Sequence, residues 1–307
     1  MDNPVPINSQ EIPRFAGIST FMRLPWITDL SKIDVAFIGI PFDGGQSYRS
    51  GSRFGPRSVR DASGGVKPYN VAMKVNPYKK HRIGDYGDFV TNPLSLEVSH
   101  RLITEQMMKV AEHRVIPVSV GGDHSISLPI LRALSKIHGP LGLIHFDAHH
   151  DCWDQYFGSK YGGGTPFRRA VEEGLINPKK MVQIGLRGPG YAEDDYAFGS
   201  SHGIRSIMIE EMYEHGISLV LEEMDRLRND KTYVTFDIDA IDPAFAPGTT
   251  APTPGGFTSS DAIRMMRHLK GFNTVGFDVV EVQPMYDVSN MTSILAATLA
   301  FEYISTL

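Results

Sequence analysis

The chain alternates short, wholly apolar runs with longer amphipathic segments, and this alternation constrains its fold more than any other feature. An apolar run of strand length is typical of a strand that is buried on both faces of a sheet. Strands that alternate with helices predict an α/β fold, with a mostly parallel sheet flanked by helices on both sides. The predicted strands are 35–40, 115–120, 141–146, 181–186, 204–209, 232–237 and 274–280.

Segments of helical length separate these runs, and Ser259 or Ser260 is the expected N-cap of one of them. No linker, low-complexity tract or internal repeat interrupts the 307 residues, so we expect one domain over residues 31–307. The proline-rich residues 1–30 form an expected N-terminal arm, which we place in subunit contacts. The predicted helices are 97–113, 125–138, 209–227, 259–270 and 290–304.

Composition argues against several classes of partner. The net charge is only −5 and basic residues do not cluster, so nucleic acid is not expected to bind. No stretch reaches the roughly 18 apolar residues of a membrane span, and the start of the chain lacks the features of a signal peptide. A single cysteine, Cys152, fits a reducing compartment. We therefore expect a cytoplasmic protein that acts on a small molecule.

Ionisable residues gather where the predicted strands end. Three strands lead into the sequences GGDHS, DAHHD and DIDAIDP, and a fourth leads into Glu281. Ligands of parallel α/β sheets bind at the carboxyl ends of the strands. Buried carboxylates without partners are costly or lose their charge. These strand ends are therefore either solvated loops or the site of a cationic ligand.

The spacing of these residues favours a cation. Asp147, His149 and Asp151 lie at i, i+2 and i+4, and an extended backbone directs such residues to one side. Asp237 and Asp239 repeat the same spacing. Four carboxylates and two imidazoles suit two divalent metal ions that share bridging carboxylates, and a set without thiolate favours manganese, with nickel, iron or zinc as alternatives. The six predicted ligands are His124, Asp147, His149, Asp151, Asp237 and Asp239.

Each of these residues also has a structural interpretation when it is taken alone. An aspartate after a strand often caps a helix or closes a turn. His150 and Cys152 have the opposite parity to the predicted ligands, so we expect neither to bind metal. Asp154 and Asp242 are interpreted as loop groups or as groups that support the ligands from behind. The metal interpretation rests on all six residues falling together at three strand ends.

The three motifs resemble the metal signatures of the ureohydrolases, the arginase and agmatinase family. The match to "GGDHS", "FDAHHD" and "DIDAIDPAFAPGT" extends to "GIPFDGGQSYRSGSRFGPRSVR" and "GFDVVEVQPMYD", and so covers essentially the whole chain. The resemblance implies a three-layer arginase-like fold, a binuclear centre that usually holds manganese, and hydrolysis of a guanidino group to urea and an amine. It also implies an oligomer, either a trimer or a hexamer.

The resemblance assigns roles to individual residues. It implies one metal held by His124, Asp147, Asp151 and Asp237, and a second held by Asp147, His149, Asp237 and Asp239. Glu281 would face the guanidinium, to which a carboxylate can bind through two hydrogen bonds. Because metal binding lowers the pKa of water from 15.7 to about 7, hydroxide becomes available for the attack. Asp151 is expected to move a proton from that nucleophile.

Two departures from the family pattern lie near the expected chemistry. Family members usually carry a histidine before the sequence GTPFRR, and that histidine is thought to relay protons, but this chain has Gly163 there. The usual GTGTP reads GTTAP here, with Thr249 and Thr250 expected at the substrate and Ala251 in place of a hydroxyl residue. Three interpretations stay open: drift in a tolerant loop, a remodelled substrate pocket, and a weakly active partner subunit of a mixed oligomer.

The substrate is therefore left open at this level. The first hypothesis is an agmatinase-like enzyme for a linear guanidino compound such as agmatine or 4-guanidinobutanoate. The alternative is an unusual small guanidine, such as free guanidine or a biguanide like metformin, hydrolysed with manganese or nickel. The predicted substrate-binding residues are Glu281, Gly163, Thr249 and Thr250.

Overall fold

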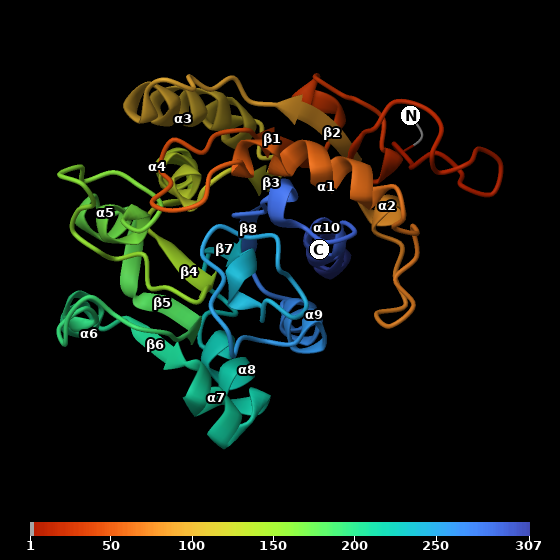
Figure 1. Ribbon diagram of the computed structural model, residues 1–307. Helices are drawn as coiled ribbons and strands as arrows, with labels where there is room; N and C mark the ends of the chain where they lie inside the picture. The colour runs from red at the N-terminus through yellow and green to blue at the C-terminus, as the bar shows by residue number, and fades with distance from the viewer. Residues whose placement is uncertain (1–2) are drawn as a thin grey trace.

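The computed structural model describes residues 3–307, and it confirms the predicted architecture (Figure 1). Eight strands form one parallel sheet in the order β2-β1-β3-β8-β7-β4-β5-β6. The strands are β1 (Val35–Ile40), β2 (Ile83–Asp88), β3 (Ile116–Gly121), β4 (Leu141–Phe146), β5 (Ile176–Leu186), β6 (Arg205–Met208), β7 (Thr232–Asp237) and β8 (Thr274–Val280).

Helices cover both faces of the sheet, so that the fold has three layers. On one side α1, α10 and α9 pack against one another, and on the other side α3, α4 and α5 do so (Figure 1). The helices are α1 (Gly55–Ser63), α2 (Pro77–Lys80), α3 (Leu96–Glu112), α4 (Ser127–His138), α5 (Pro166–Glu172), α6 (Ala197–His202), α7 (Ile209–His215), α8 (Ile217–Asp225), α9 (Ser259–His268) and α10 (Met291–Thr306). None of the described helices has the length and apolar character that crossing a bilayer requires.

Alternate residues of the central strands enter two separate cores. In β4, Ile144 and Phe146 join the core under α9 and α10, whereas Leu141 and Leu143 join the core under α3 and α4. Successive side chains of a strand point to opposite faces of a sheet. The wholly apolar runs in the sequence are explained by this burial on both faces.

Several local predictions were wrong. The predicted helix 209–227 is two helices, α7 and α8, because Gly216 adopts φ +80 between them. Helix α9 is capped by neither Ser259 nor Ser260 but by Thr258, which forms a reciprocal capping box with Asp261. Strand β2 and helices α1, α2, α5 and α6 were not predicted at all.

The role of the arm over residues 1–30 in subunit contacts stays a prediction. Residues 1 and 2 of the arm lie outside the described part of the chain. Its later residues run along the edge of the sheet, where Trp26 forms an isolated parallel bridge with Asp85 of β2. The N–H of Phe21 donates to Asp85 Oδ2 at 2.7 Å. The arm thus contacts the edge strand of its own chain.

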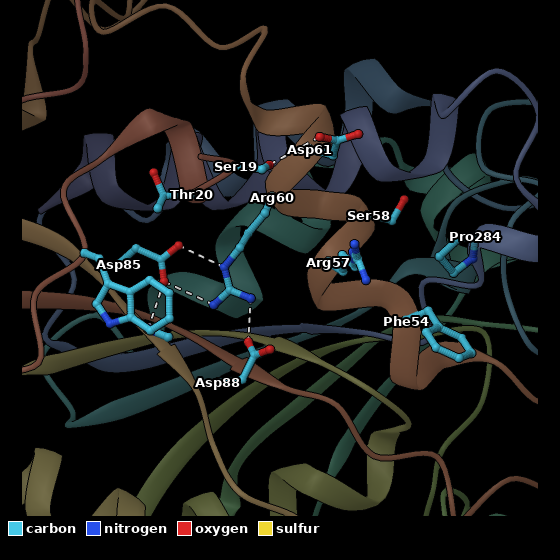
Figure 2. A pocket seen from close by; sticks show the side chains of 12 residues that line it. Ser19, Thr20, Phe54, Arg57, Ser58, Arg60, Asp61, Asp85, Asp88 and Pro284 are labelled. Atoms are coloured by element: carbon cyan, nitrogen blue, oxygen red, sulfur yellow. Dashed lines mark hydrogen bonds and ion pairs between the residues drawn. The ribbon is translucent and has the colours of Figure 1, made fainter. Parts of the chain in front are cut away.

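Helix α1 is tied to this same edge by a buried ion pair, which lies in a cavity of about 580 Å³ (Figure 2). The Arg60 Nε lies 2.8 Å from Asp85 Oδ2, and Arg60 also pairs with Asp88. The Asp85 side chain is only 2% exposed. Figure 2 shows the guanidinium of Arg60 between the two carboxylates.

Replacing Arg60 by alanine is expected to lower the free energy of unfolding by about 3–5 kcal/mol, because Asp85 is left as a buried charge without its partner. Urea denaturation followed by circular dichroism measures the change. Arg57→Ala is the control, since Arg57 lines the same cavity on the same helix but is exposed. Equal stability of the two variants would show that the ion pair does not stabilise the edge.

Candidate metal centre and substrate pocket

The predicted ligands and Glu281 follow four strands that are neighbours in the centre of the sheet. The order β3-β8-β7-β4 places the ends of these strands side by side. His124 follows β3, and Glu281 follows β8. Asp237 and Asp239 lie at the end of β7. Three further predicted ligands follow β4: Asp147, His149 and Asp151. The structure therefore brings all seven residues to one edge.

Two imidazole–carboxylate groups form at this edge. His124 Nδ1 lies 3.1 Å from Asp147 Oδ2, 2.9 Å from Asp151 Oδ2 and 3.4 Å from Asp237 Oδ2. The second group contains His149, whose Nδ1 lies 3.1 Å from Asp239 Oδ2 and 3.4 Å from Asp147 Oδ1. Asp147 belongs to both groups through its two oxygens. This arrangement matches a carboxylate that bridges two ions.

The buried carboxylates of this cluster need cations to stabilise their charged form. Burial, followed by the charges of Asp239 and Asp147, raises the pKa of Asp237 well above its ordinary value. Burial opposes the charged form of His124 as well, yet its carboxylate neighbours outweigh this and raise its pKa. His124 Nδ1 is buried and has no hydrogen-bond partner among the described residues. An imidazole nitrogen without a hydrogen-bond partner, surrounded by carboxylate oxygens, is typical of the ligands of a divalent metal ion. The residues present fit two such ions.

A hydrogen-bond chain fixes the orientation of His124. The Thr235 hydroxyl donates its proton to Asp278 Oδ1 at 2.5 Å, so it accepts from His124 Nε2 at 2.9 Å. The Nε2 atom therefore carries the imidazole proton, and the lone pair of Nδ1 faces the cluster. Asp278 is itself held by Ser127 and Tyr233, each at 2.7 Å. Partners of this kind set the tautomer and basicity of a metal ligand.

We expect Asp278→Asn to weaken metal affinity by roughly 10- to 100-fold, because the asparagine no longer accepts the threonine proton with a full charge. Competition with a chelator of known affinity measures the effect. Ser127→Ala is the matched control, since it removes a different hydrogen bond of Asp278 and leaves the link to Thr235 intact. A folded Asp278→Asn protein with unchanged metal affinity would contradict the role of the chain.

The backbone at the cluster differs from the extended path that the spacing suggested. Asp239 lies in a 3-10 turn, Ile238–Ala240, and its N–H donates to Asp237 Oδ1 at 2.9 Å. Asp151 adopts φ +48 and Glu281 adopts φ +65. Such left-handed conformations are unfavourable for residues other than glycine and are concentrated at functional sites. The i, i+2 spacing thus selected residues that meet in one cluster, although the extended backbone path that it assumed is wrong.

Glu281 lies at the base of a cavity beside the cluster and is already well hydrogen-bonded. Its Oε1 accepts the N–H of His124 at 2.7 Å, and its Oε2 accepts from Gln46 Nε2 at 2.6 Å and from the hydroxyl of Thr250. Burial, and then the nearby charge of Asp123, raises the pKa of Glu281 to about 8. These contacts fix a carboxylate whose desolvation favours a cationic partner.

The cavity has a volume of about 400 Å³ and joins the cluster to the surface. Thr250 lines it, whereas the side chain of Thr249 is fully buried and does not. Gly163 lines it as well, and its N–H donates to Gly45 O at 2.9 Å. The other predicted residues that line it are His149, Asp151, Asp237, Asp239 and Glu281, with His124 and Asp147 packed outside the lining.

The residues predicted to stay outside the cluster lie in other environments. His150 packs its ring 4.0 Å from that of Trp153, and burial lowers its pKa to about 4. Cys152 is buried in the core. Asp154 pairs with Arg169 at 2.8 Å, and Asp242 accepts loop N–H groups, including that of Gly255 at 2.6 Å.

Sequence reasoning missed several residues of the site. His145 lies inside β4 with its Nε2 at 2.7 Å from Asp147 Oδ2, and its Nδ1 lies 3.1 Å from Gln183 Nε2. Its parity is that of Asp147, His149 and Asp151, which was a signal that could have identified it. The other missed residues lie in irregular loops, where no local period marks them: Gln46, Tyr48, Trp153, Tyr156, Phe157 and Tyr191.

Comparisons with known proteins agree with this geometry. A family model described as the Arginase family matches residues 33–305. A guanidinopropionase of Pseudomonas aeruginosa is 49% identical over 303 residues, which cover 98% of this chain and 95% of that protein. The mitochondrial agmatinase of Gallus gallus is 41% identical over 304 residues, covering 99% of this chain and 89% of that protein.

Solved structures show the same fold. The proclavaminate amidino hydrolase from Streptomyces clavuligerus has a TM-score of 0.91 and 37% identity, and the match covers 96% of this chain and 100% of that chain. A hypothetical agmatinase from Burkholderia thailandensis has a TM-score of 0.89 and 38% identity, covering 95% and 91%. The resemblance inferred from the three motifs is confirmed, and the chain belongs to the Arginase family.

Proposed function

We propose that this protein hydrolyses a guanidino compound to urea and an amine, with two divalent metal ions held by the six predicted ligands. One observation carries the proposal: two imidazole–carboxylate groups share Asp147 and border the cavity in which Glu281 lies. The relatives support the substrate class, since they are named guanidinopropionase, guanidinobutyrase and agmatinase. We propose manganese as the metal, with nickel as the alternative, because the donor set contains oxygen and imidazole without thiolate.

The metal ions, when bound, lower the pKa of water so that hydroxide is available near neutral pH. The protein's own residues bind and orient the substrate. Glu281 faces the planar guanidinium and can accept two parallel N–H donors, while Gln46 and Thr250 hold its carboxylate in place. Asp151 lines the cavity beside His124 and is placed to take a proton from the attacking water.

Replacing Glu281 by glutamine is expected to raise KM and lower kcat, with a loss of roughly 10- to 100-fold in kcat/KM. One charge-assisted contact is worth about 1.5–3 kcal/mol, and the glutamine keeps the shape while removing the charge. Steady-state urea release measures both constants. Unchanged kinetics would remove Glu281 from substrate binding.

We also propose that the protein works as a homotrimer or homohexamer in the cytoplasm. The single cysteine, which is buried, supports a reducing compartment. A mixed oligomer with a related chain remains the alternative, and the retention of all six ligands supports an active subunit over an inactive partner.

A urea-release assay over a panel of guanidino compounds, with manganese and with nickel, tests the proposal. The panel contains agmatine, 4-guanidinobutanoate, guanidine and 1,1-dimethylbiguanide. We expect metal-dependent urea release from at least one compound. The absence of urea from every compound with either metal would contradict the proposed activity.

A further inference from the structure

A wall of aromatic rings lines the outer part of the substrate cavity. The ring centroids of Trp153 and Tyr156 are 5.4 Å apart, those of Trp153 and Tyr191 are 5.7 Å apart, and those of Tyr156 and Tyr191 are 6.1 Å apart. We call these three residues the ring cluster. Each pair meets at a steep angle of between 66° and 74°, so the rings form a corner rather than a flat stack.

Trp153 and Tyr156 of the ring cluster pack against a turn with three consecutive glycines at residues 162–164. A Cβ atom at Gly164 would lie 2.3 Å from Tyr156 Cε2 and 2.9 Å from Trp153 Cε3, so the rings need a glycine there. A Cβ atom at the preceding residue, Gly163, would lie 3.7 Å from Glu281 Oε1. Consecutive Cα atoms are about 3.8 Å apart. The ring cluster and the guanidinium-binding carboxylate therefore flank one short turn, and a compact substrate can touch both.

The charges around the ring cluster favour a cation. The cavity lining contains no lysine or arginine among the described residues. The segment that carries Tyr191 continues into Glu193, Asp194 and Asp195, and the N–H of Tyr191 donates to Asp195 Oδ2 at 2.6 Å. A substrate carboxylate would meet aromatic faces here and would find no basic side chain among the described residues that line the cavity.

One arginine, Arg49, lies beside the lining residue Tyr48, but it already contacts other groups. The Arg49 guanidinium lies 4.5 Å from the ring centre of Tyr286 and 5.6 Å from that of Tyr48. Its Nη1 is 3.5 Å from Thr249 O. Arg49 is not part of the cavity lining. It therefore does not supply the cation that a carboxylate tail would need.

We infer that the ring cluster binds the distal part of the substrate, and that this part is a cationic group such as an ammonium or an alkylated amidinium and not a carboxylate. Aromatic faces attract cations, and aromatic corners are used to recognise alkylated nitrogen. This inference rests on the proposed function for the guanidino end of the substrate. It separates this chain in tail preference from the relatives named guanidinopropionase, guanidinobutyrase and guanidino acid hydrolase.

Substrates of matched length test the inference. Agmatine and 4-guanidinobutanoate share a four-carbon chain and differ in whether the tail is an ammonium or a carboxylate. Calorimetry gives the dissociation constant of each compound, and urea release gives kcat/KM. We expect the cationic compound to bind at least about 10-fold more tightly than the carboxylate. Equal or tighter binding of 4-guanidinobutanoate would overturn the inference.

Tyr191→Leu tests the ring cluster itself, because Tyr191 is 76% exposed and its replacement does not threaten folding. We expect the affinity for agmatine to fall by roughly 3- to 30-fold more than the affinity for guanidine, which has no tail. Tyr69→Leu is the control, since Tyr69 is also exposed but lies in another cavity. Equal losses for agmatine and guanidine would overturn the role of the ring cluster.

The two proposals fail in different ways. Preferred release of urea from the carboxylate compound would overturn the inference and leave the proposed activity intact. Binding of agmatine that depends on Tyr191, without urea release from any compound, would support the ring cluster and contradict the proposed activity.

Discussion

Replacing Asp239 by alanine is expected to abolish urea release and to reduce the bound metal from about two ions per chain to about one. Asp239 belongs only to the group around His149, where its Oδ2 lies 3.1 Å from His149 Nδ1. The group around His124 keeps its own carboxylates, Asp147, Asp151 and Asp237. Loss of one site of a binuclear pair therefore removes activity without emptying the other site. Metal analysis of the purified protein and a urea assay measure the two quantities.

Asp242→Ala is the matched control for this variant. Asp242 lies three residues further along the chain, but its carboxylate accepts loop N–H groups instead of facing the cluster. We expect the control to keep its metal content even if it is less stable. An Asp239→Ala protein with full activity and unchanged metal content would contradict the ligand assignment.

Introducing a histidine at Gly163 is expected to change which substrates are turned over. A Cβ at this position would lie 3.4 Å from Gly45 O and 3.7 Å from Glu281 Oε1, so the Cβ atom itself fits without a clash beside Glu281. Positioned proton transfer contributes about 10²–10⁴-fold in rate. A primary alkylamine needs that proton more than ammonia or a guanidine unit does. We therefore expect Gly163→His to raise kcat for agmatine by at least about 10-fold and to slow the small guanidines by filling the cavity.

The wild type should correspondingly turn over agmatine more slowly than another guanidino compound. Gly163→Ala separates bulk from proton transfer, because alanine fills space and carries no titratable group. If the wild type hydrolyses agmatine with a kcat in the ordinary range of about 1–10³ s⁻¹ and the histidine changes nothing, the glycine reflects drift and the pocket is not remodelled.

The cluster of proposed metal ligands could be predicted from the sequence because its residues lie at fixed offsets from strand ends. Parallel strands bring their carboxyl ends to one edge, so GGDHS, DAHHD and DIDAIDP had to meet once the sheet was assigned. Local spacing then selected Asp147, His149 and Asp151 over His150 and Cys152.

The substrate wall could not be predicted in the same way. Trp153, Tyr156 and Tyr191 come from two irregular loops, and their contacts depend on long-range packing that no local period encodes. His145 was missed for a different reason, because it lies inside a strand whose other residues are almost all apolar. Asp278 was missed in the same way, because it lies within the buried strand β8. It orients the His124 ring through the hydroxyl of Thr235.

The edge strand β2 escaped prediction because its sequence, IGDYGD, is not an apolar run. Asp85 is buried there with Arg60 of α1 and the N–H of Phe21 as its partners, and both are tertiary contacts. The sequence pattern did not reveal the split between α7 and α8, because the amphipathic pattern continues through Gly216. The φ of +80 at Gly216 ends one helix there.

Titration of the metal-free protein with manganese, followed by urea release at each step, tests the central claim most directly. The ligands of two groups share Asp147, so activity should appear only as the second ion binds and should level off at about two ions per chain. Chelation should reverse it, and nickel should be compared in the same titration. Full urea release from protein that contains no metal would contradict the account.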